Sequence, residues 1–147
     1  MSLYFEDFSP GIEHTTRGRT ITESDVVHFA GISGDFIELH TNEEFARHSP
    51  YGRRIAHGML TLSIATGLMT QMNLITDTVV AFYGIDKLRF VKPVFIGDTL
   101  HVKKKVIDAV AKGGTAGVVT FETTVLNQNA EPVLVYKDKL AIKRRPT

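Results

Sequence analysis

The stretch that decides the fold is IAHGMLTLSIATGLMTQM, residues 55–72. From Gly58 onward, apolar side chains fall on nearly every side of a helix. They are Met59, Leu60, Leu62, Ile64, Ala65, Leu68, Met69 and Met72. A helix that is apolar all round is normally buried in a protein core. Since much of the remaining chain reads as strands, we predict that a sheet wraps around this helix.

The chain before this helix predicts one strand and two helices. Residues 12–21 alternate weakly and predict a first strand. Thr22, with Asp25 three residues later, has the capping-box spacing that begins a helix, and Gly31 and Gly34 are expected to end it. Its apolar face is expected to comprise Val26, Val27, Phe29, Ala30 and Ile32. Asn42 is expected to cap a short helix over residues 43–47.

The chain after the helix predicts long antiparallel strands over residues 79–91, 99–110, 115–127 and 132–143. A bend is expected near Gly84, and turns are expected at residues 112–114 and 128–131. Apolar and polar residues alternate in parts of these strands, so one side of the sheet can face water. The sequence therefore predicts a single α+β domain over residues 1–147, with a curved antiparallel sheet wrapped around a long central helix.

Composition excludes several classes of protein. The 147 residues carry a formal net charge of +1 and include no cysteine, which excludes disulfides, a thiolate nucleophile and a cysteine metal site. The acidic N-terminus is not a signal peptide, and no apolar run approaches the roughly 20 residues needed to span a bilayer. We therefore expect a cytoplasmic protein that binds neither nucleic acid nor a membrane.

Asp35 and His40 are the candidate acid/base pair, five residues apart in GDFIELH, residues 34–40. A carboxylate beside an imidazole suits proton transfer, because histidine changes charge near neutral pH and a nearby carboxylate tunes it. In such a pair, Asp35 accepts a proton from water while His40 holds the water. The alternative is structural, with Asp35 in a turn or cap and His40 as a hydrogen-bonded loop residue.

Gly58 is the second candidate feature. A glycine at the start of a buried helix presents a main-chain N–H, without a side chain, at the positive end of the helix dipole. Such a donor can stabilise the negative charge that forms on a thioester oxygen. The alternative is that Gly58 only allows close packing. His57 is expected to have a structural role beside the turn, and it is also placed among the candidate substrate-binding residues.

Together these motifs resemble the MaoC-like dehydratases, also called (R)-specific enoyl-CoA hydratases, of the hotdog-fold superfamily. Residues 34–40 match the family motif Gly-Asp-x-Asn-Pro-apolar-His at the Asp and the His, and residues 55–60 resemble its helix-start signature. Residues 88–100, LRFVKPVFIGDTL, resemble a strand–turn–strand segment that recurs among hotdog proteins. The resemblance runs from about Phe5 to the last strand and implies the hotdog fold.

The resemblance also implies roles for individual residues. Asp35 and His40 would be catalytic, and the Gly58 N–H would bind the thioester oxygen. A family hydroxyl that steadies the Asp falls on Thr66 by ungapped spacing, with Ser63 as the alternative. The chain departs from the motif at Ile37 and Glu38, which replace its Asn and Pro. These changes remove a polar group and a rigid residue from the loop between the catalytic pair.

The implied reaction is the reversible hydration of a trans-2-enoyl thioester to a (3R)-3-hydroxyacyl thioester, without a metal or redox cofactor. Coenzyme A or an acyl carrier protein would be part of the substrate, and the protein would form a homodimer or a higher homo-oligomer. Arg53, Arg54 and Lys103 are candidates for contacting the carrier's phosphates, with plain surface charge as the alternative. Two other functions stay open, namely a hotdog acyl-CoA thioesterase and a non-catalytic acyl-CoA-binding protein.

Overall fold

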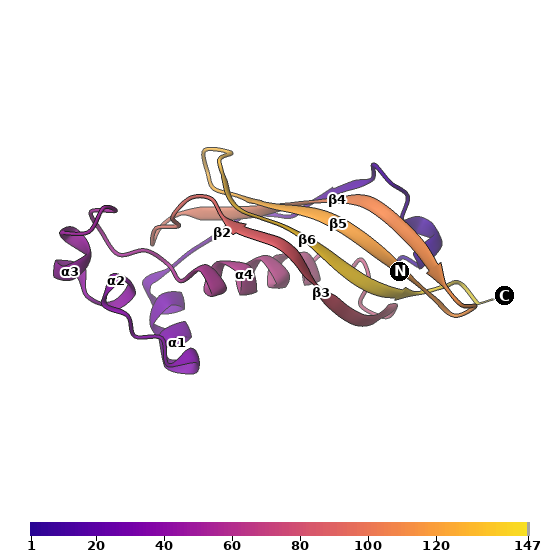
Figure 1. Ribbon diagram of the computed structural model, residues 1–147, viewed down its shortest axis with the longest axis horizontal. Helices are drawn as coiled ribbons and strands as arrows, with labels where there is room; N and C mark the ends of the chain where they lie inside the picture. Colours follow the sequence, from indigo (N-terminus) through magenta and orange to yellow (C-terminus); the bar gives the residue numbers. More distant parts are fainter. Residues whose placement is uncertain (147) are drawn as a thin grey trace.

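The computed structural model describes residues 1–146, and the last residue of the predicted domain, 147, lies outside this range. Six strands form one antiparallel sheet with the order β1-β4-β5-β6-β3, and β2 pairs separately with β4. The strands are β1 (Glu13–Thr15), β2 (Arg19–Thr20), β3 (Val79–Phe90), β4 (Thr99–Lys112), β5 (Ala116–Leu126) and β6 (Pro132–Lys143). In Figure 1 the long strands run side by side over helix α4 (Gly58–Thr70).

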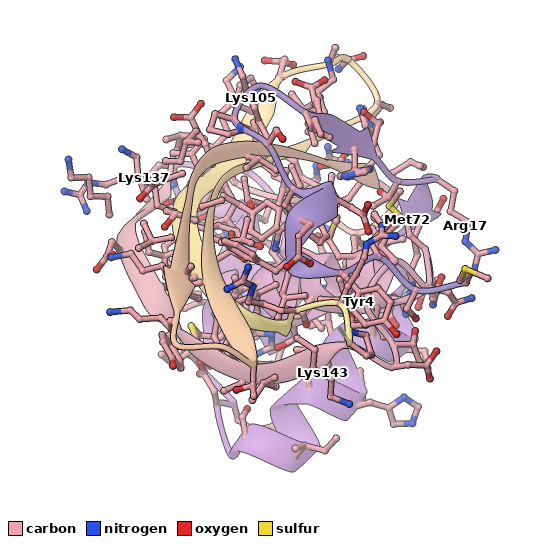
Figure 2. The ribbon with its side chains drawn as sticks, turned by 90° about the vertical axis from the view of Figure 1, so that its right-hand side faces the viewer. Tyr4, Arg17, Met72, Lys105, Lys137 and Lys143 are labelled. Atoms are coloured by element: carbon pink, nitrogen blue, oxygen red, sulfur yellow. The ribbon has the colours of Figure 1, made fainter. Side chains whose placement is uncertain are left out.

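The predicted α+β architecture, a curved antiparallel sheet around a central helix, is confirmed. Figure 2 shows the strands arching around an interior filled with side chains. The bend predicted near Gly84 lies at a register shift between β3 and β6, where Gly84 adopts φ 154°. This positive φ favours glycine, so the edge strand bends where the sequence supplies one.

Helix α4 supplies the main core. Its buried side chains, including Leu60, Ile64 and Leu68, pack with strand residues such as Val102 and Leu134. Fully burying a side chain of this size contributes about 1.5–3 kcal/mol relative to exposure. The helix is not enclosed on every side, because Met59 is 55% exposed and the polar residues of the same face meet solvent. The apolar pattern therefore predicted the helix correctly but overestimated how much of its surface is buried.

The smaller elements lie together at the end of the molecule where α4 begins (Figure 1). They are α1 (Glu23–Ser33), α2 (Glu38–Thr41) and α3 (Glu43–Arg47). The short 3-10 helix η1 (Phe5–Asp7) lies elsewhere and packs against β5. The capping box of Thr22 and Asp25 and the Asn42 cap are confirmed. Hydrogen bonds from Thr22 and the charge of Arg19 outweigh the effect of burial and lower the pKa of Asp25.

Three local predictions need correction. Residues 12–21 form two short strands rather than one, because their register with β4 shifts by one residue between Thr15 and Arg19. Helix α1 continues through Gly31 and ends at the left-handed Gly34, and its predicted apolar face is only partly buried, with Val27 55% and Ile32 88% exposed. The predicted loop around His40 contains α2, a single helical turn that the sequence analysis missed. Within residues 1–146, no helix is long and apolar enough to cross a membrane.

A buried charged cluster crosses the middle of the sheet. The Lys104 ammonium donates to the Asp138 carboxylate, which also accepts a 2.7 Å hydrogen bond from the Thr123 hydroxyl. The two charged side chains are only 8% and 3% exposed. His14 lies opposite Lys104 on β1, where burial lowers the pKa of its imidazole and the Lys104 charge lowers it further. The cluster therefore lies within the core, away from the cavity described below.

Removing one member of this cluster should be costly. We expect Lys104→Met to lower the free energy of unfolding by about 3–5 kcal/mol, because it leaves the Asp138 charge buried without its partner. The matched control is Lys139→Met, which breaks an exposed 3.7 Å pair with Asp86 and should cost at most about 1 kcal/mol. Urea denaturation followed by circular dichroism measures both. Equal effects from the two variants would contradict this account of the cluster.

Candidate active site

Asp35 is held immediately after helix α1. The left-handed Gly34 ends the helix and turns the chain, and the Asp35 N–H then donates to the Ser33 hydroxyl at 3.1 Å. The Asp35 carboxylate accepts the Ile37 N–H at 3.3 Å, which closes a small side-chain turn. This turn is the structural role considered for Asp35 from the sequence. It occupies one carboxylate oxygen, Oδ1, and no hydrogen bond within residues 1–146 uses the other.

His40 lies on α2 with a defined ring orientation. Its Nδ1 is 2.8 Å from the main-chain oxygen of Ile55. A carbonyl oxygen only accepts, so Nδ1 carries the proton in the neutral ring and Nε2 keeps its lone pair. A free imidazole nitrogen is a proton acceptor, as general base catalysis requires.

His57 contacts both Asp35 and His40. Its Nε2 donates to the main-chain oxygen of Asp35 at 2.9 Å, and its ring stacks on His40 with centroids 3.9 Å apart and planes 29° apart. The residue is 2% exposed, and its Nδ1 is buried without a partner among the described residues. Each of Asp35, His40 and His57 has a polar side-chain atom within 4.8 Å of the others.

The three side chains line a cavity of about 450 Å³ at the start of α4. Gly58, Met59 and Thr61 contribute from the helix, and Phe90, Pro93 and Val133 contribute from the sheet and its loop. The Gly58 N–H belongs to the first turn of α4, whose N–H groups have no acceptor within the helix. The cavity therefore combines a carboxylate, an imidazole and a helix N-terminus with an apolar wall.

Gly58 is also a place of close approach. A Cβ atom built at this position would lie 2.6 Å from Cε1 of Phe90. Its φ is not in the left-handed region, so tight packing rather than backbone conformation favours glycine here. The packing explanation considered from the sequence is thus supported. Close packing and hydrogen bonding by the Gly58 N–H are compatible roles, because the N–H and the position of a side chain point in different directions.

Among residues 1–146, neither Thr66 nor Ser63 makes a hydrogen bond to Asp35, and the role of Thr66 in steadying that carboxylate stays a prediction. The Thr66 hydroxyl donates to the Ser63 oxygen at 2.7 Å, and the Ser63 hydroxyl donates to the Met59 oxygen at 2.8 Å. Both side chains are exposed, and eight residues of helix separate Thr66 from Gly58 by about 12 Å. The buried hydroxyl at the cavity is Thr61, which the sequence analysis missed although it lies in the first turn after Gly58.

Two predicted phosphate ligands have other partners. The Arg54 guanidinium donates to the carboxylates of Glu23 and Glu43, and hydrogen bonds to these two groups raise the pKa of Arg54. Its charge is therefore already compensated. The Lys103 ammonium is 4.0 Å from Glu13 and lines neither described cavity. Lys103 alternates with buried Lys104 on β4, so its side chain points to the opposite, solvent face.

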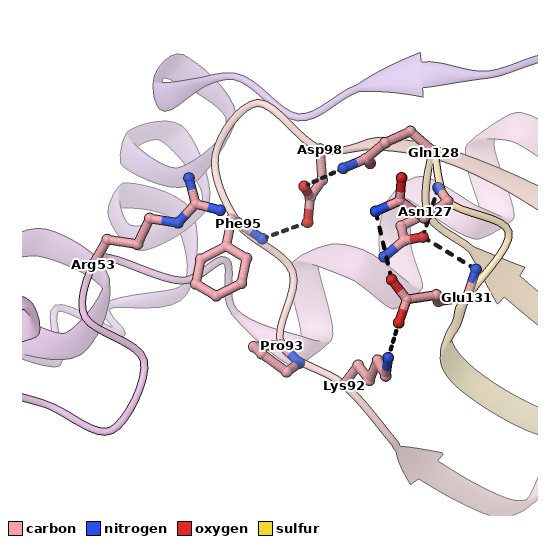
Figure 3. A pocket seen from close by; sticks show the side chains of 9 residues that line it. Arg53, Lys92, Pro93, Phe95, Asp98, Asn127, Gln128 and Glu131 are labelled. Carbon is pink, nitrogen blue, oxygen red and sulfur yellow. Dashed lines mark hydrogen bonds and ion pairs between the residues drawn. The ribbon is translucent and has the colours of Figure 1, made fainter.

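Arg53 differs from its neighbour because its guanidinium has no carboxylate partner among residues 1–146. It lies over the Phe95 ring, 3.9 Å from the centroid. Figure 3 shows it at one end of a second cavity of about 250 Å³, opposite the ion pair of Lys92 and Glu131. Lys92 and Pro93 line both cavities, so Arg53 lies near the site with a positive charge available to a ligand.

Asp35, His40 and His57 each place one potential metal ligand atom within 4.8 Å of the others. The lone pair of a ring nitrogen lies in the plane of the ring. Two nearly parallel rings 3.9 Å apart cannot both aim such lone pairs at one ion about 2 Å away. In this arrangement the site suits proton transfer better than metal binding.

The family model described as the MaoC like domain matches residues 8–129. The chain is 41% identical over 100 residues to Protein MaoC of Klebsiella aerogenes, covering 68% of this chain and 29% of that protein. It is 38% identical over 109 residues to 3-hydroxybutyryl-CoA dehydratase of Methylorubrum extorquens, covering 74% and 66%. It is 36% identical over 122 residues to (R)-specific enoyl-CoA hydratase of Rhodospirillum rubrum, covering 82% and 79%. The chain thus spans under a third of Protein MaoC.

Solved structures agree with the fold. A monoamine oxidase regulatory protein from Archaeoglobus fulgidus superposes with a TM-score of 0.92 at 40% identity, covering 99% of this chain and 97% of that one. A Mycobacterium tuberculosis protein with a double hotdog fold superposes with a TM-score of 0.85 at 23% identity, covering 99% and 45%. At this lower identity the likeness shows the fold alone.

The curved antiparallel sheet around one helix is the hotdog fold, and a carboxylate and an imidazole lie at the N-terminus of that helix. The chain belongs to the MaoC-like family. The resemblance described from the sequence is thereby confirmed at the level of fold and family.

Proposed function

We propose that the protein catalyses the reversible hydration of a trans-2-enoyl thioester to a (3R)-3-hydroxyacyl thioester. The observation that carries the proposal is the convergence of the Asp35 carboxylate and the His40 imidazole on one cavity at the start of α4. The names of two relatives, a 3-hydroxybutyryl-CoA dehydratase and an (R)-specific enoyl-CoA hydratase, support the same chemistry.

In the hydration direction, a water molecule binds between Asp35 and the unprotonated Nε2 of His40. One of the two groups removes a proton as the water oxygen bonds to C3 of the enoyl group. The electron pair of the double bond moves toward the thioester carbonyl, and the Gly58 N–H stabilises the developing negative charge. The removed proton is then delivered to C2 from the same site, so one water is added in total. No step requires a metal or redox cofactor.

The acid/base pair also separates this function from two alternatives. A hotdog thioesterase would release a free thiol, whereas hydration leaves the thioester intact. A non-catalytic binding protein would bind acyl-CoA without turnover, and Ile37 and Glu38, in place of the family's Asn and Pro, are the residues that favour this alternative. The hydration assay below distinguishes all three.

Hydration of crotonyl-CoA, followed by loss of the enoyl absorbance, tests the proposal. We expect Asp35→Asn and His40→Ala each to lower kcat by about 10²–10⁴-fold, because each removes one partner in proton transfer. Chelation with EDTA should leave the wild-type rate unchanged, and a thiol reagent should detect no released coenzyme A. Undiminished hydration in both variants would defeat the assignment, and thiol release by the wild type would favour a thioesterase.

We further propose coenzyme A as the carrier, with Arg53 as a phosphate contact. Its guanidinium is exposed and free of carboxylates, whereas the guanidinium of Arg54 is held by two of them. Arginine and phosphate form strong charge-assisted hydrogen bonds. Arg53 lies beside a wall shared with the catalytic cavity, where the polar end of a bound coenzyme A would leave the site.

Substitution of Arg53 tests the carrier contact. Arg53→Gln should raise KM for crotonyl-CoA about threefold to fivefold, since an exposed charge pair contributes at most about 1 kcal/mol. It should leave KM unchanged for the crotonyl thioester of N-acetylcysteamine, which lacks phosphates. Lys103→Gln is the matched control, because it removes an equal charge away from the cavity. Equal changes in KM with both thioesters would contradict a phosphate contact.

We also propose that the protein forms a homodimer through β3. This strand lies at one edge of the sheet, with its other side unpaired. It carries large exposed apolar side chains, including Val80, Phe82 and Tyr83. An exposed apolar strand edge favours association with another strand, and a second copy offers the same edge by two-fold symmetry.

A charge on β3 should disrupt this dimer. We expect the wild type to sediment as twice the 16.3 kDa chain mass and Phe82→Lys to shift toward the single-chain mass. The control is Val110→Lys, which places the same charge at an exposed apolar position near the far end of β4. A wild type that sediments at 16.3 kDa would refute the proposal.

A further inference from the structure

His57 is a buried titratable residue that lines the catalytic cavity and that the proposed mechanism leaves unused. We propose that it is a positioning residue, which holds the Asp35 main chain and the His40 ring in the geometry needed for proton transfer. The inference rests on the proposed function. The inference extends the proposed function by assigning a role to a side chain that transfers no proton itself.

The first observation is the hydrogen bond between His57 Nε2 and the Asp35 oxygen, 2.9 Å long. Among the described hydrogen bonds, it is the one that joins residue 35 directly to the start of α4. The other contacts of Asp35, with Ser33 and Ile37, are local to its own loop. The position of the carboxylate relative to the Gly58 N–H therefore depends on His57.

The second observation is the stacking of His57 on His40, with centroids 3.9 Å apart. The ring of His40 is fixed at one edge by its hydrogen bond to Ile55. That hydrogen bond fixes the position of Nδ1 but still allows the plane of the His40 ring to tilt. The face of His57 removes this freedom, so Nε2 of His40 keeps one direction toward the cavity.

The third observation concerns the protonation state of His57. Its Nε2 donates to a carbonyl oxygen, so the neutral ring has its lone pair on Nδ1, which is buried without a partner. Buried polar atoms without partners are rare in stable proteins and are often found at functional positions. Because Nδ1 makes no hydrogen bond among the described residues, the Nε2 bond and the stacked face are the contacts that connect His57 to Asp35 and His40.

The alternative is that His57 merely fills space. Phe29 packs against the same ring, with centroids 4.9 Å apart and planes 58° apart, and its apolar side chain cannot donate a hydrogen bond to the Asp35 oxygen. Phe29→Leu therefore weakens the packing of His57 while leaving its hydrogen bond in place. This variant is the matched control for loss of packing.

Four variants at two positions test the proposal by crotonyl-CoA hydration and thermal unfolding. His57→Gln places an amide N–H at the same number of bonds from the main chain as Nε2, and His57→Asn is one bond too short. His57→Phe keeps the stacked ring and loses the donor. Misplacing catalytic groups by about 1 Å can cost on the order of 10²-fold in rate.

We expect His57→Phe and His57→Asn to lower kcat about 10–100-fold with KM changed less than about threefold. His57→Gln keeps the donor and loses the stacked ring, so it should lose less kcat than His57→Asn, which loses both contacts. Phe29→Leu should lose stability without a comparable loss of kcat. If His57→Phe does not fold, the Gln and Asn pair decides alone. Full activity in His57→Asn, or an equal loss of kcat in Phe29→Leu, would overturn the proposal.

A second readout does not depend on turnover, so failure of the proposed function remains distinguishable. Amide hydrogen exchange by NMR reports the Ile37 N–H, which donates to the Asp35 carboxylate. We expect its exchange to become at least tenfold faster in His57→Asn and to stay near the wild-type rate in His57→Gln. Unchanged exchange in His57→Asn would show that His57 does not hold the loop, whether or not the protein hydrates crotonyl-CoA.

Discussion

The structure depends on the burial of one face of α4 against the curved sheet. The apolar side chains of the helix form a single core with residues from several strands, including Val102, Val125 and Leu134. Because a buried helix cannot shift along its axis without losing these contacts, its N-terminus is fixed relative to the sheet. The cavity lies at that fixed point, so the same packing that stabilises the fold also places Gly58 where a substrate carbonyl would need a donor.

The candidate site is assembled around this end of the helix by hydrogen bonds to main-chain atoms. His40 is oriented by the Ile55 oxygen, and His57 holds the Asp35 oxygen. In each case one imidazole N–H donates to a main-chain carbonyl oxygen. The segment before α2 and α2 itself are therefore tied to the segment that leads into α4, even though the loop lacks the polar and rigid residues of the family motif.

The two arginines before α4 differ in the partners of their charges. Arg54 is committed to two carboxylates, Glu23 and Glu43, that join α1 and α3 to the loop before α4. Arg53, one residue earlier, lies on Phe95 and keeps its charge free. The two side chains are adjacent and chemically identical, so their difference comes entirely from the acidic side chains within reach of each one.

The sequence by itself determined the helix at Gly58, the long strands, the caps at Thr22 and Asn42, and the pair Asp35 and His40. These follow from local periodicity, capping chemistry and motif spacing, which are properties of neighbouring residues. The sequence did not determine which hydroxyl meets the cavity, which arginine is free, or that His57 stacks on His40. The position of Thr61 at the cavity and the different partners of Arg53 and Arg54 come from contacts between segments far apart in the chain. Only the tertiary structure decides such contacts, because they depend on how the sheet and helices pack together.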